Sequence, residues 1–457
     1  MGQPVTAVFD IGKTNKKFFL FGPDFKEVGR RYTQLPQTED EDGYPCEDLQ
    51  ALEAWMASEL KEALARTDID IRALNISSYG ASLVHLGRDG QVLTPLYNYT
   101  KPYPEALEDA FYTAYGPEAE FSRATGTTRA GMLTSGLQLY RLKHEAPERF
   151  AGVVKSLHLP QYLSYRLTGV PVSDYTSIGC HTGLWDYTRG GYHRWVEAEG
   201  MASRLAPIVG TGTSYSQTLH GKTLRIGVGI HDSSAALLPY LESSPEPFVL
   251  LSTGTWSVAM NPFSDGVLSP SDSAHNCINY MRVDGQPVKA ARLFLGQEFK
   301  AQVKRLCAHY GQDAHAYQQA GFNPEHFEAA RSQPDPCFHW EHLQGIPGAA
   351  ETRYDFPDFS RAYHQLVYEL CRVQEGYLRH VIGASEIRHL YIDGGFGQNA
   401  VFVAILARLM HPMELHTTDA ALGSALGAAV VVSGRELEPG FLQTHYHMKS
   451  HHPYKTH

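Results

Sequence analysis

The chain has 457 residues, of which 43% are hydrophobic and 19% are charged, and it carries a formal net charge of −10. Because one hydrophobic core rarely grows to this size, the length predicts two domains. The negative charge excludes nucleic acid and anionic membranes as bulk partners, although backbone N–H groups and lysines can still hold a small anion.

The cysteines are scattered and include no C-x-x-C pair, which argues against both a zinc site and a disulfide framework. A strand-like run begins close to the N-terminus without a signal segment before it, and no apolar stretch reaches the length of a membrane span. We therefore expect a soluble, cytoplasmic protein. The cysteines are Cys46, Cys180, Cys277, Cys307, Cys337 and Cys371.

The first half of the chain reads as an α/β unit. Apolar residues at helical spacing predict a helix over 48–66, and several helices are expected within 104–170. Alternating and buried apolar runs predict strands at 5–11, 17–22, 28–33, 73–78 and 82–86.

The segment LESSPEPF, 241–248, has the composition of a linker, so we expect domains at 1–242 and 243–457. The second half opens with the hairpin VLLSTGTWSVAMNP, which has the organisation of the N-terminal hairpin. A helix over 361–382, a strand over 389–393 and a helix ending at Met410 are expected further on. The two halves are therefore interpreted as weakly similar units.

The N-terminal hairpin VFDIGKTNKKFFLF places polar residues between two apolar strands. Gly12 lets the backbone approach a ligand closely, and turn N–H groups with Lys13, Thr14 and Lys17 suit phosphate oxygens. Asp10 at the strand end can hold a divalent cation, directly or through water. An ordinary charged hairpin is the alternative.

The second hairpin carries Ser252, Thr253, Gly254 and Thr255 between buried strands. The threonines could serve only as strand formers. Two polar hairpins, one in each half, are however what a nucleoside triphosphate held between two domains requires.

The stretch YIDGGFGQN places Gly394, Gly395 and Gly397 between a strand and a helix, whose N-terminus would face a ligand. The spacing is not G-x-G-x-x-G, so a dinucleotide fold is rejected. A tight connection without a ligand is the alternative. The small residues over 420–429 admit either a flat ring or a closely packed helix.

In IGVGIHDSSAALLPY, His231 and Asp232 lie where an apolar strand gives way to a helix. Asp232 could be the N-cap of that helix. Alternatively, it is a general base directed into the cleft between the halves.

Together, these stretches resemble the FGGY family of carbohydrate kinases, over roughly residues 5–435 and in the family's order. DIGKTNKK is similar to the first phosphate motif, LSTGTWS to the form found in rhamnulokinases and fuculokinases, and DGGFGQN to the adenosine motif. GIHDSSAA matches the segment with the catalytic aspartate. YLSYRLTG and SDYTSIGCHTGLWD match the sugar-domain signature.

The resemblance implies two ribonuclease-H-like α/β domains of the actin, hexokinase and Hsp70 superfold, with an active-site cleft between them. The N-terminal domain would bind sugar, and the C-terminal domain would bind nucleotide. Asp232 would accept the proton of a sugar hydroxyl as that hydroxyl attacks the γ-phosphoryl group of ATP, and Asp10 would position Mg²⁺. The implied ATP contacts are Gly12, Lys13, Thr14, Lys17, Gly254, Thr255, Gly394, Gly395 and Asn399.

The chain departs from the family pattern at several positions. Lys13 stands where threonine is usual, Lys17 where arginine is usual, and Gln161 where aspartate is common. In PLYNYTK, Tyr99 and Lys101 occupy positions where aspartate and arginine often contact sugar. With Gln161, these replacements make the sugar pocket unusual. At Lys17 the positive charge is kept, but the bidentate geometry of arginine with phosphate is lost.

The substrate is expected to be a ketose such as L-rhamnulose, L-fuculose, L-ribulose or D-xylulose. For the tyrosines among the expected sugar contacts, the alternative is a packed, tyrosine-rich surface without a ligand. The oligomeric state stays open, with a homodimer as one option. The expected sugar contacts are Tyr79, His85, Tyr99, Lys101, His231 and Asp232.

Two other classes of function fit the same fold. A non-catalytic sugar sensor is disfavoured by the presence of both Asp10 and Asp232, and a partner-driven ATPase by the sugar-domain signature. The histidines near the C-terminus favour a solvated tail, with a metal site as the alternative. These are His445, His447, His451, His452 and His457.

Overall fold

The computed structural model describes residues 2–418 and 423–452, with the backbone alone for 273 and 274. The chain forms two compact units that interleave along the sequence. The first comprises Met1–Ser243, Ser264–Val288 and Gly423–Glu438, and the second comprises Ser244–Phe263, Lys289–Leu422 and Pro439–His457. The division into domains at 242 and 243 stays a proposal.

A mixed sheet organises the first unit, in the order β13-β14-β6-β1-β2-β3, with β15 also paired to β6. The strands β1, β2 and β3 are antiparallel, whereas β6 runs parallel to β1, β14 and β15. The expected N-terminal strands are thereby confirmed. Their bounds are β1 (Gln3–Ile11), β2 (Lys16–Phe21), β3 (Glu27–Thr33), β6 (Ile69–Ser78), β13 (Ser214–Leu219), β14 (Lys222–Gly227) and β15 (Ile230–His231).

Helix α1 (Leu49–Ala65) contributes one side of the first core. It begins after the N-cap Asp48, whose carboxylate accepts a hydrogen bond from the N–H of Ala51 at 2.9 Å. Its buried face carries Leu52, Met56 and Leu60, which join the apolar side chains of β1, β2 and β6 in one cluster. Helical periodicity placed this face correctly from the sequence.

A second core in the first unit is built around helices. Phe111 and Trp195 pack edge to face with ring centroids 5.3 Å apart, and the indole N–H of Trp195 donates to the carbonyl of Gly183 at 2.7 Å. The elements that contribute to it include β7 (Leu83–Leu86), α2 (Glu105–Tyr115), α3 (Glu118–Thr125), α4 (Ser135–Glu145), α5 (Pro147–Ala151) and α8 (Arg194–Ala198). The buried apolar residues of β8 (Lys155–His158) and α6 (Leu159–Thr168) belong to the first core instead.

Shorter elements complete the first unit. They are β4 (Gln37–Glu39), β5 (Pro45–Glu47), η1 (Gly131–Leu133), β9 (Ser173–Asp174), α7 (Tyr175–Ile178), β10 (Trp185–Asp186), β11 (Gly191–Tyr192), η2 (Ala202–Arg204), β12 (Ile208–Val209), α10 (Pro270–Ala274) and β18 (Cys277–Met281).

The second unit repeats the organisation of the first sheet: an antiparallel hairpin continues into parallel strands. Its strands follow the order β19-β17-β16-β20-β21-β22, with β16, β20 and β21 parallel to one another. This supports the interpretation of two similar units. The strands are β16 (Phe248–Thr253), β17 (Ser257–Asn261), β19 (Pro287–Leu293), β20 (His389–Gly394), β21 (Glu414–Thr417) and β22 (Lys449–His451).

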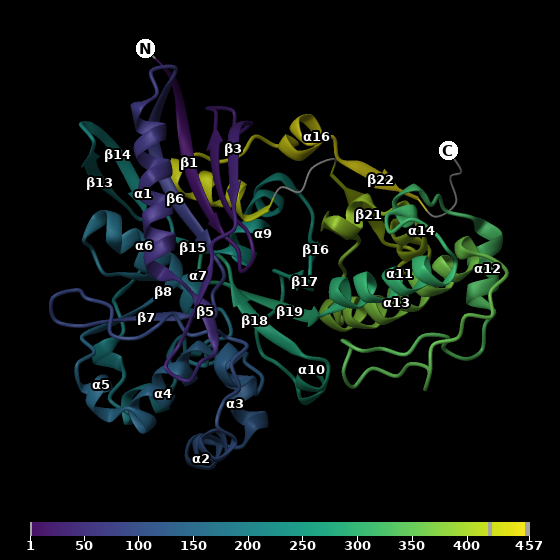
Figure 1. Cartoon of the computed structure of the whole chain (residues 1–457), viewed down its shortest axis with the longest axis horizontal. Coiled ribbons are helices and arrows are strands. Elements are labelled where there is room, and N and C mark those ends of the chain that lie inside the picture. Colours follow the sequence, from purple (N-terminus) through teal and green to yellow (C-terminus); the bar gives the residue numbers. More distant parts are fainter. Residues whose placement is uncertain (1, 419–422, 453–457) are drawn as a thin grey trace. The chain divides into compact units, whose positions relative to one another are not determined.

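Helix α13 (Phe359–Ile382) is the central helix of the second unit and lies beside α11 and α14 (Figure 1). Its N-cap Asp358 accepts a hydrogen bond from the N–H of Arg361 at 2.8 Å. The other helices are α11 (Leu295–His309), η3 (Ala316–Gln319), α12 (Pro324–Arg331), η4 (Gly395–Gln398), α14 (Ala400–Leu409) and α16 (Phe441–His445).

The small-residue stretch near the C-terminus forms α15 (Gly423–Ser433), which returns to the first unit and packs on α9 (Asp232–Ser243), β1 and β6 (yellow in Figure 1). A Cβ atom on Gly427 would lie 1.8 Å from the carbonyl oxygen of Ala235. Close helix packing therefore explains the described part of this stretch, and 420–422 lie outside the described residues.

The described chain contains no helix with both the length and the hydrophobicity that a membrane span needs. All six cysteines are buried thiols.

The contact between α15 and α9 predicts that Gly427→Ala lowers the free energy of unfolding by about 1–3 kcal/mol, because the added methyl group forces two backbones apart. Gly376→Ala is the matched control: this exposed helical glycine in α13 has nothing within 4 Å of a built Cβ. It should gain about 0.5–1 kcal/mol from helix propensity. Urea unfolding measures both, and equal stability of the two variants would contradict the packing.

Candidate functional site

The parallel strands of the first unit bring several sequence-predicted residues together. Because β1, β6 and β15 run parallel, the residues at their carboxyl ends gather at the same end of the sheet. These ends carry Asp10, Tyr79 and Asp232. The same geometry places ligand sites in other α/β proteins.

Asp10 is 7% exposed and has a partner for each carboxylate oxygen. Oδ2 lies 3.0 Å from Nζ of Lys17, its cross-strand neighbour, and Oδ1 accepts a hydrogen bond from the hydroxyl of Ser424 at 2.5 Å. Burial acts to lower the pKa of Lys17, but Asp10, with a smaller contribution from Asp232, holds it above its ordinary value. Asp10 and Lys17 therefore form an ion pair, and the charge of Asp232 acts on the same lysine.

The hairpin loop is closed by a lysine that sequence reasoning did not select. Lys16 is buried, and its Nζ donates to the carbonyls of Gly12 at 2.9 Å and Lys13 at 3.0 Å. It also lies 3.0 Å from the carboxylate of Glu47. Thr14 is exposed at the loop tip. Residue type could not separate Lys16 from Lys17, because the two differ only in the face of β2 that they occupy.

Lys13 points toward aromatic rings. Its Nζ lies 5.7 Å from the ring centroid of Tyr79 and 5.1 Å from that of Tyr99, within reach of a cation–π contact. Burial lowers the pKa of Lys13, although Glu47 acts to raise it. The hydroxyl of Tyr79 donates to Glu47 at 2.8 Å. Tyr79 and Tyr99 are thus joined to the hairpin, and their role in sugar binding stays a prediction.

Asp232 is the first residue of α9, and its side chain is 35% exposed. Its Oδ1 accepts from the N–H of Ser233 at 2.6 Å. An N-cap instead accepts from an N–H two or three residues further along the helix. This contact therefore does not account for Asp232 as an ordinary cap.

His231 is buried behind Asp232 and connects it to Cys180. Nδ1 lies 3.1 Å from the hydroxyl of Ser234, which itself donates to the carbonyl of Met281 at 2.8 Å. Ser234 must therefore accept from Nδ1–H, which assigns the tautomer. Nε2 then faces the thiol of Cys180 at 3.0 Å and Oδ1 of Asp232 at 3.2 Å. Sequence reasoning missed Cys180 because it treated the cysteines as core residues.

Burial lowers the pKa of His231, although Asp232 and Asp174 act to raise it. The imidazole is therefore neutral near pH 7. A neutral ring with Nδ1–H presents Nε2 as an acceptor, to which the thiol of Cys180 can donate at 3.0 Å.

Two of the expected sugar contacts have their partners elsewhere in the first unit. His85 is fully buried in β7, where its Nδ1 lies 2.8 Å from the hydroxyl of Ser156 and burial lowers its pKa to about 4. Lys101 is buried against two carboxylates, at 2.6 Å from Asp40 and 2.5 Å from Asp42. Their roles in sugar binding stay predictions.

Gln161, the departure from the family's aspartate, is also accounted for by local contacts. Its amide donates to the Asp174 carboxylate at 3.0 Å and to the carbonyl of Gly229 at 3.1 Å. It therefore supports the chain immediately before β15.

The second unit contains a cavity of about 440 Å³ beside the glycine-rich loop. Gly254, Gly395 and Asn399 line it, as three of the predicted nucleotide residues. A Cβ on Gly395 would meet nothing within 4 Å, so this backbone faces open space. Sequence reasoning missed the remaining wall, because α11 and η3 carry no recognisable motif. That wall includes Phe299, Lys300 and Tyr317.

The glycine-rich loop is fixed by close backbone contacts. Gly394 has φ 87°, and a Cβ there would lie 1.9 Å from the carbonyl oxygen of Thr253. The Thr253 hydroxyl donates to the main-chain carbonyl of Asp393 and accepts from the N–H of Phe396. The loop forms the 3₁₀ turn η4, so α14 begins at Ala400 rather than directly after the glycines.

Asn399 is the N-cap of α14. Its side-chain oxygen accepts from the N–H of Phe402 at 3.1 Å, and its amide donates to the hydroxyl of Tyr363 at 2.8 Å. On the other side of the loop, the carbonyl of Thr255 accepts from the N–H of Gln297 at 3.2 Å. These bonds join the two predicted nucleotide stretches to α11 and α13.

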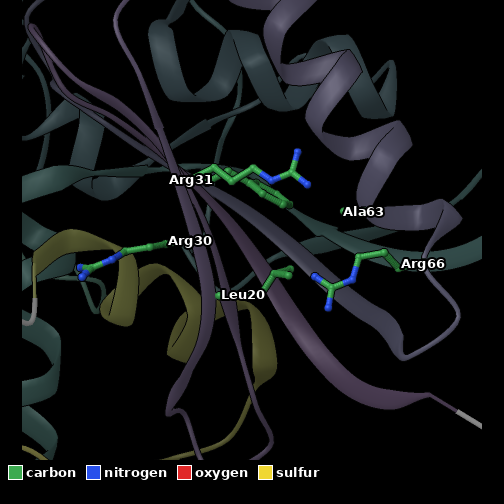
Figure 2. Close-up of a pocket in the computed structure, with 7 residues that line it drawn as sticks. Leu20, Arg30, Arg31, Ala63 and Arg66 are labelled. Atoms are coloured by element: carbon green, nitrogen blue, oxygen red, sulfur yellow. The ribbon is translucent and has the colours of Figure 1, made fainter.

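A smaller cavity, of about 130 Å³, lies between β3 and α1 in the first unit. Figure 2 shows Arg31 and Arg66 on one side of the strand and Arg30 directed to the other. Arg31 contacts Glu59 and Glu62, and Arg66 contacts Asp68. Because these guanidinium groups already have carboxylate partners, the cavity is not a candidate anion site.

Comparison with known proteins connects both sites to one family. Residues 5–231 match the N-terminal domain model of the FGGY family of carbohydrate kinases, and 245–323 match an FGGY C-terminal domain model. The chain is 27% identical over 301 residues to a rhamnulokinase from Bacteroides thetaiotaomicron, covering 62% of this chain and 60% of the relative. It is 26% identical to a rhamnulokinase from Pectobacterium carotovorum, over 83% of this chain and 77% of the relative.

The chain thus spans only part of the length of these relatives. A crystal structure of a carbohydrate kinase from Novosphingobium aromaticivorans superimposes with a TM-score of 0.78 at 25% identity, over 98% of this chain and 97% of that chain. This confirms the expected fold class, a two-domain α/β fold of the actin and hexokinase type. The chain belongs to the FGGY family of carbohydrate kinases.

Proposed function

We propose that this protein transfers the γ-phosphoryl group of ATP to a hydroxyl of a sugar. The observation that carries the proposal is the group formed by Asp10, Lys17 and Asp232 at the carboxyl ends of parallel strands. Phosphoryl transfer needs a base for the attacking hydroxyl and positive charge for the phosphates. This group supplies both from one end of one sheet.

Asp232 is the proposed general base, and His231 assists it. The proton of the sugar hydroxyl would pass to the Asp232 carboxylate, whose Oδ1 lies 3.2 Å from Nε2 of His231. Cys180 and Ser234 hold the imidazole, so His231 acts as a positioning residue.

The phosphates are assigned to the hairpin of β1 and β2, with Lys17 as its cationic group. The carboxylate of Asp10 offers oxygen ligands of the kind that Mg²⁺ prefers, directly or through water, so this residue fits the ion. When bound, Mg²⁺ would neutralise charge on the phosphates. Lys16 holds the hairpin loop closed through its hydrogen bonds to the loop carbonyls. Lys13 lies against the rings of Tyr79 and Tyr99.

The nucleotide is assigned to the cavity of the second unit. Its volume falls in the range of about 300–1,000 Å³ that is common for small-molecule sites. Phe299 and Tyr317 offer apolar surface for a flat base, Lys300 offers a positive charge, and Gly395 leaves room for the ligand. The reaction consumes ATP, which favours the cytoplasm as its compartment.

A ketose is the proposed acceptor, with L-rhamnulose first because two relatives bear the name rhamnulokinase. L-Fuculose, L-ribulose and D-xylulose follow. Tyr79 and Tyr99 would stack on the C–H face of the sugar.

Asp232→Asn should lower kcat by about two to four orders of magnitude, because it removes the base and keeps the size of the side chain. ATP affinity should persist in calorimetric titration. The control is Asp89→Asn, an exposed aspartate in a turn of the same unit, which should keep full activity. Near-normal turnover of Asp232→Asn would refute the assignment of the base.

Gly395→Val should raise the KM for ATP on the order of tenfold, because the new side chain enters the nucleotide cavity. The sugar KM should change little. Gly212→Val, at an exposed glycine with nothing within 4 Å of a built Cβ, is the control. If ATP affinity is unchanged while sugar affinity falls, the two ligands have been assigned to the wrong units.

Lys101→Met separates a structural role from sugar binding. Burial acts to raise the pKa of Asp40, but the hydrogen bond and charge of Lys101 hold it below its ordinary value. The stabilisation is therefore complete above the unfolded pKa of about 3.9 and is lost as pH falls through the lower folded pKa. Removing Lys101 leaves the buried Asp40 carboxylate without its cationic partner, with only the N–H groups of Asp42 and Tyr44 as donors, which should cost about 3–5 kcal/mol at pH 7.

Urea unfolding of Lys101→Met at pH 7 and pH 3 tests this, and the difference from wild type should shrink at the lower pH. Lys26→Met, which removes an exposed ion pair to Asp24, should cost under about 1 kcal/mol. Unchanged stability together with an altered ranking of sugar epimers would instead support direct sugar contact.

A further inference from the structure

Two neighbouring strands of the second unit place three metal-binding side chains on one face. In the parallel pair β20 and β21, His389 is opposite Glu414 and Tyr391 is opposite His416. Because side chains alternate between faces, these residues share one side of the sheet. Leu390 and Leu415 between them are fully buried on the other side.

The ligand atoms of this cluster converge. Nδ1 of His389 lies 3.0 Å from Nε2 of His416. Oε2 of Glu414 lies 3.9 Å from the first nitrogen and 4.0 Å from the second. One nitrogen from each imidazole and one carboxylate oxygen therefore surround a common point.

The outer nitrogens of both rings are also held. Nε2 of His389 lies 2.8 Å from the carboxylate of Glu246, and Nδ1 of His416 lies 3.0 Å from the hydroxyl of Ser450 on β22. A carboxylate accepts only, so Nε2 of His389 carries the proton and Nδ1 presents its lone pair to the cluster. Histidines that bind metal usually donate their other N–H to such a partner, which fixes ring and tautomer.

An ion can reach the cluster from solvent. The side chains of Glu414 and Glu246 are more than half exposed, at 52% and 63%.

We propose that His389, Glu414 and His416 form a zinc site with an open fourth position. Zn–N bonds of about 2.0–2.1 Å in a tetrahedral site separate two ligand nitrogens by about 3.3 Å, close to the 3.0 Å observed. The exposed Glu414 side chain completes the site by moving its oxygen roughly half an ångström toward each nitrogen. Ser450 couples the site to β22, so zinc would also stabilise this C-terminal strand.

A hydrogen-bonded pair without metal is the competing explanation. His416 could donate from Nε2 to His389 while Ser450 donates to Nδ1 of His416. That arrangement explains the 3.0 Å separation and gives no role to Glu414. A substitution of Glu414 therefore distinguishes the zinc site from the hydrogen-bonded pair.

The test uses the full chain, stripped with a chelator and dialysed. Zinc added in competition with a chromophoric chelator should bind at one ion per chain, and Co²⁺ should give the absorption of a tetrahedral N/O site. Glu414→Gln and His389→Gln should each weaken zinc binding at least tenfold. His220→Asn, on an exposed turn of the first unit, should leave binding unchanged.

Zinc should also raise the thermal midpoint of wild type and not of Glu414→Gln. If His389→Gln fails to fold, the surface variant Glu414→Gln still tests the zinc site. No stoichiometric zinc, or equal binding by wild type and Glu414→Gln, overturns the site and leaves the hydrogen-bonded pair. Because the readouts are metal content, absorption and stability, a failure of the proposed kinase activity would not affect them.

Discussion

The buried carboxylate of Asp10 is the constraint on which the first unit depends. A carboxylate that is 7% exposed requires partners, because desolvating an uncompensated charge is expensive. Lys17 on the next strand and Ser424 on α15 provide them. One charged side chain therefore joins the N-terminal hairpin to a helix more than four hundred residues later in the chain. That helix in turn packs on α9, which begins at Asp232.

Strand direction explains why these groups meet. In each unit, an antiparallel hairpin continues into parallel strands, and the parallel strands bring their carboxyl ends together. In the first unit this gathers two carboxylates and a lysine. In the second unit it puts the loop after β16 beside the loop after β20, where Gly394 fits against Thr253 only because it lacks a Cβ atom. The same architecture thus produces a charged site in one unit and an open cavity in the other.

Periodicity was sufficient to predict the elements that position the site. The hairpin strands, α1, α13 and the connection after β20 follow from alternation, helical spacing and glycine clusters. Long-range features were not predictable in this way. The return of α15 to the first unit and the burial of Lys101 against Asp40 depend on residues far apart in sequence. Lys16 was not predicted as a site residue. Whether Lys16 or Lys17 is directed inward depends on the exact residue at which β2 begins. His389 and His416 meet only once the register of β20 and β21 is known.

The central claim is that the charged group at Asp10, Lys17 and Asp232 transfers phosphate from ATP to a sugar. The most direct measurement is ADP formation by the unmodified protein with Mg-ATP, in the presence and absence of L-rhamnulose and the other ketoses. The account predicts ADP release that depends on sugar and equals the sugar phosphate formed. ADP release without sugar would indicate an ATPase, and no ADP release with any sugar that binds would indicate a sensor. Either result would contradict the account.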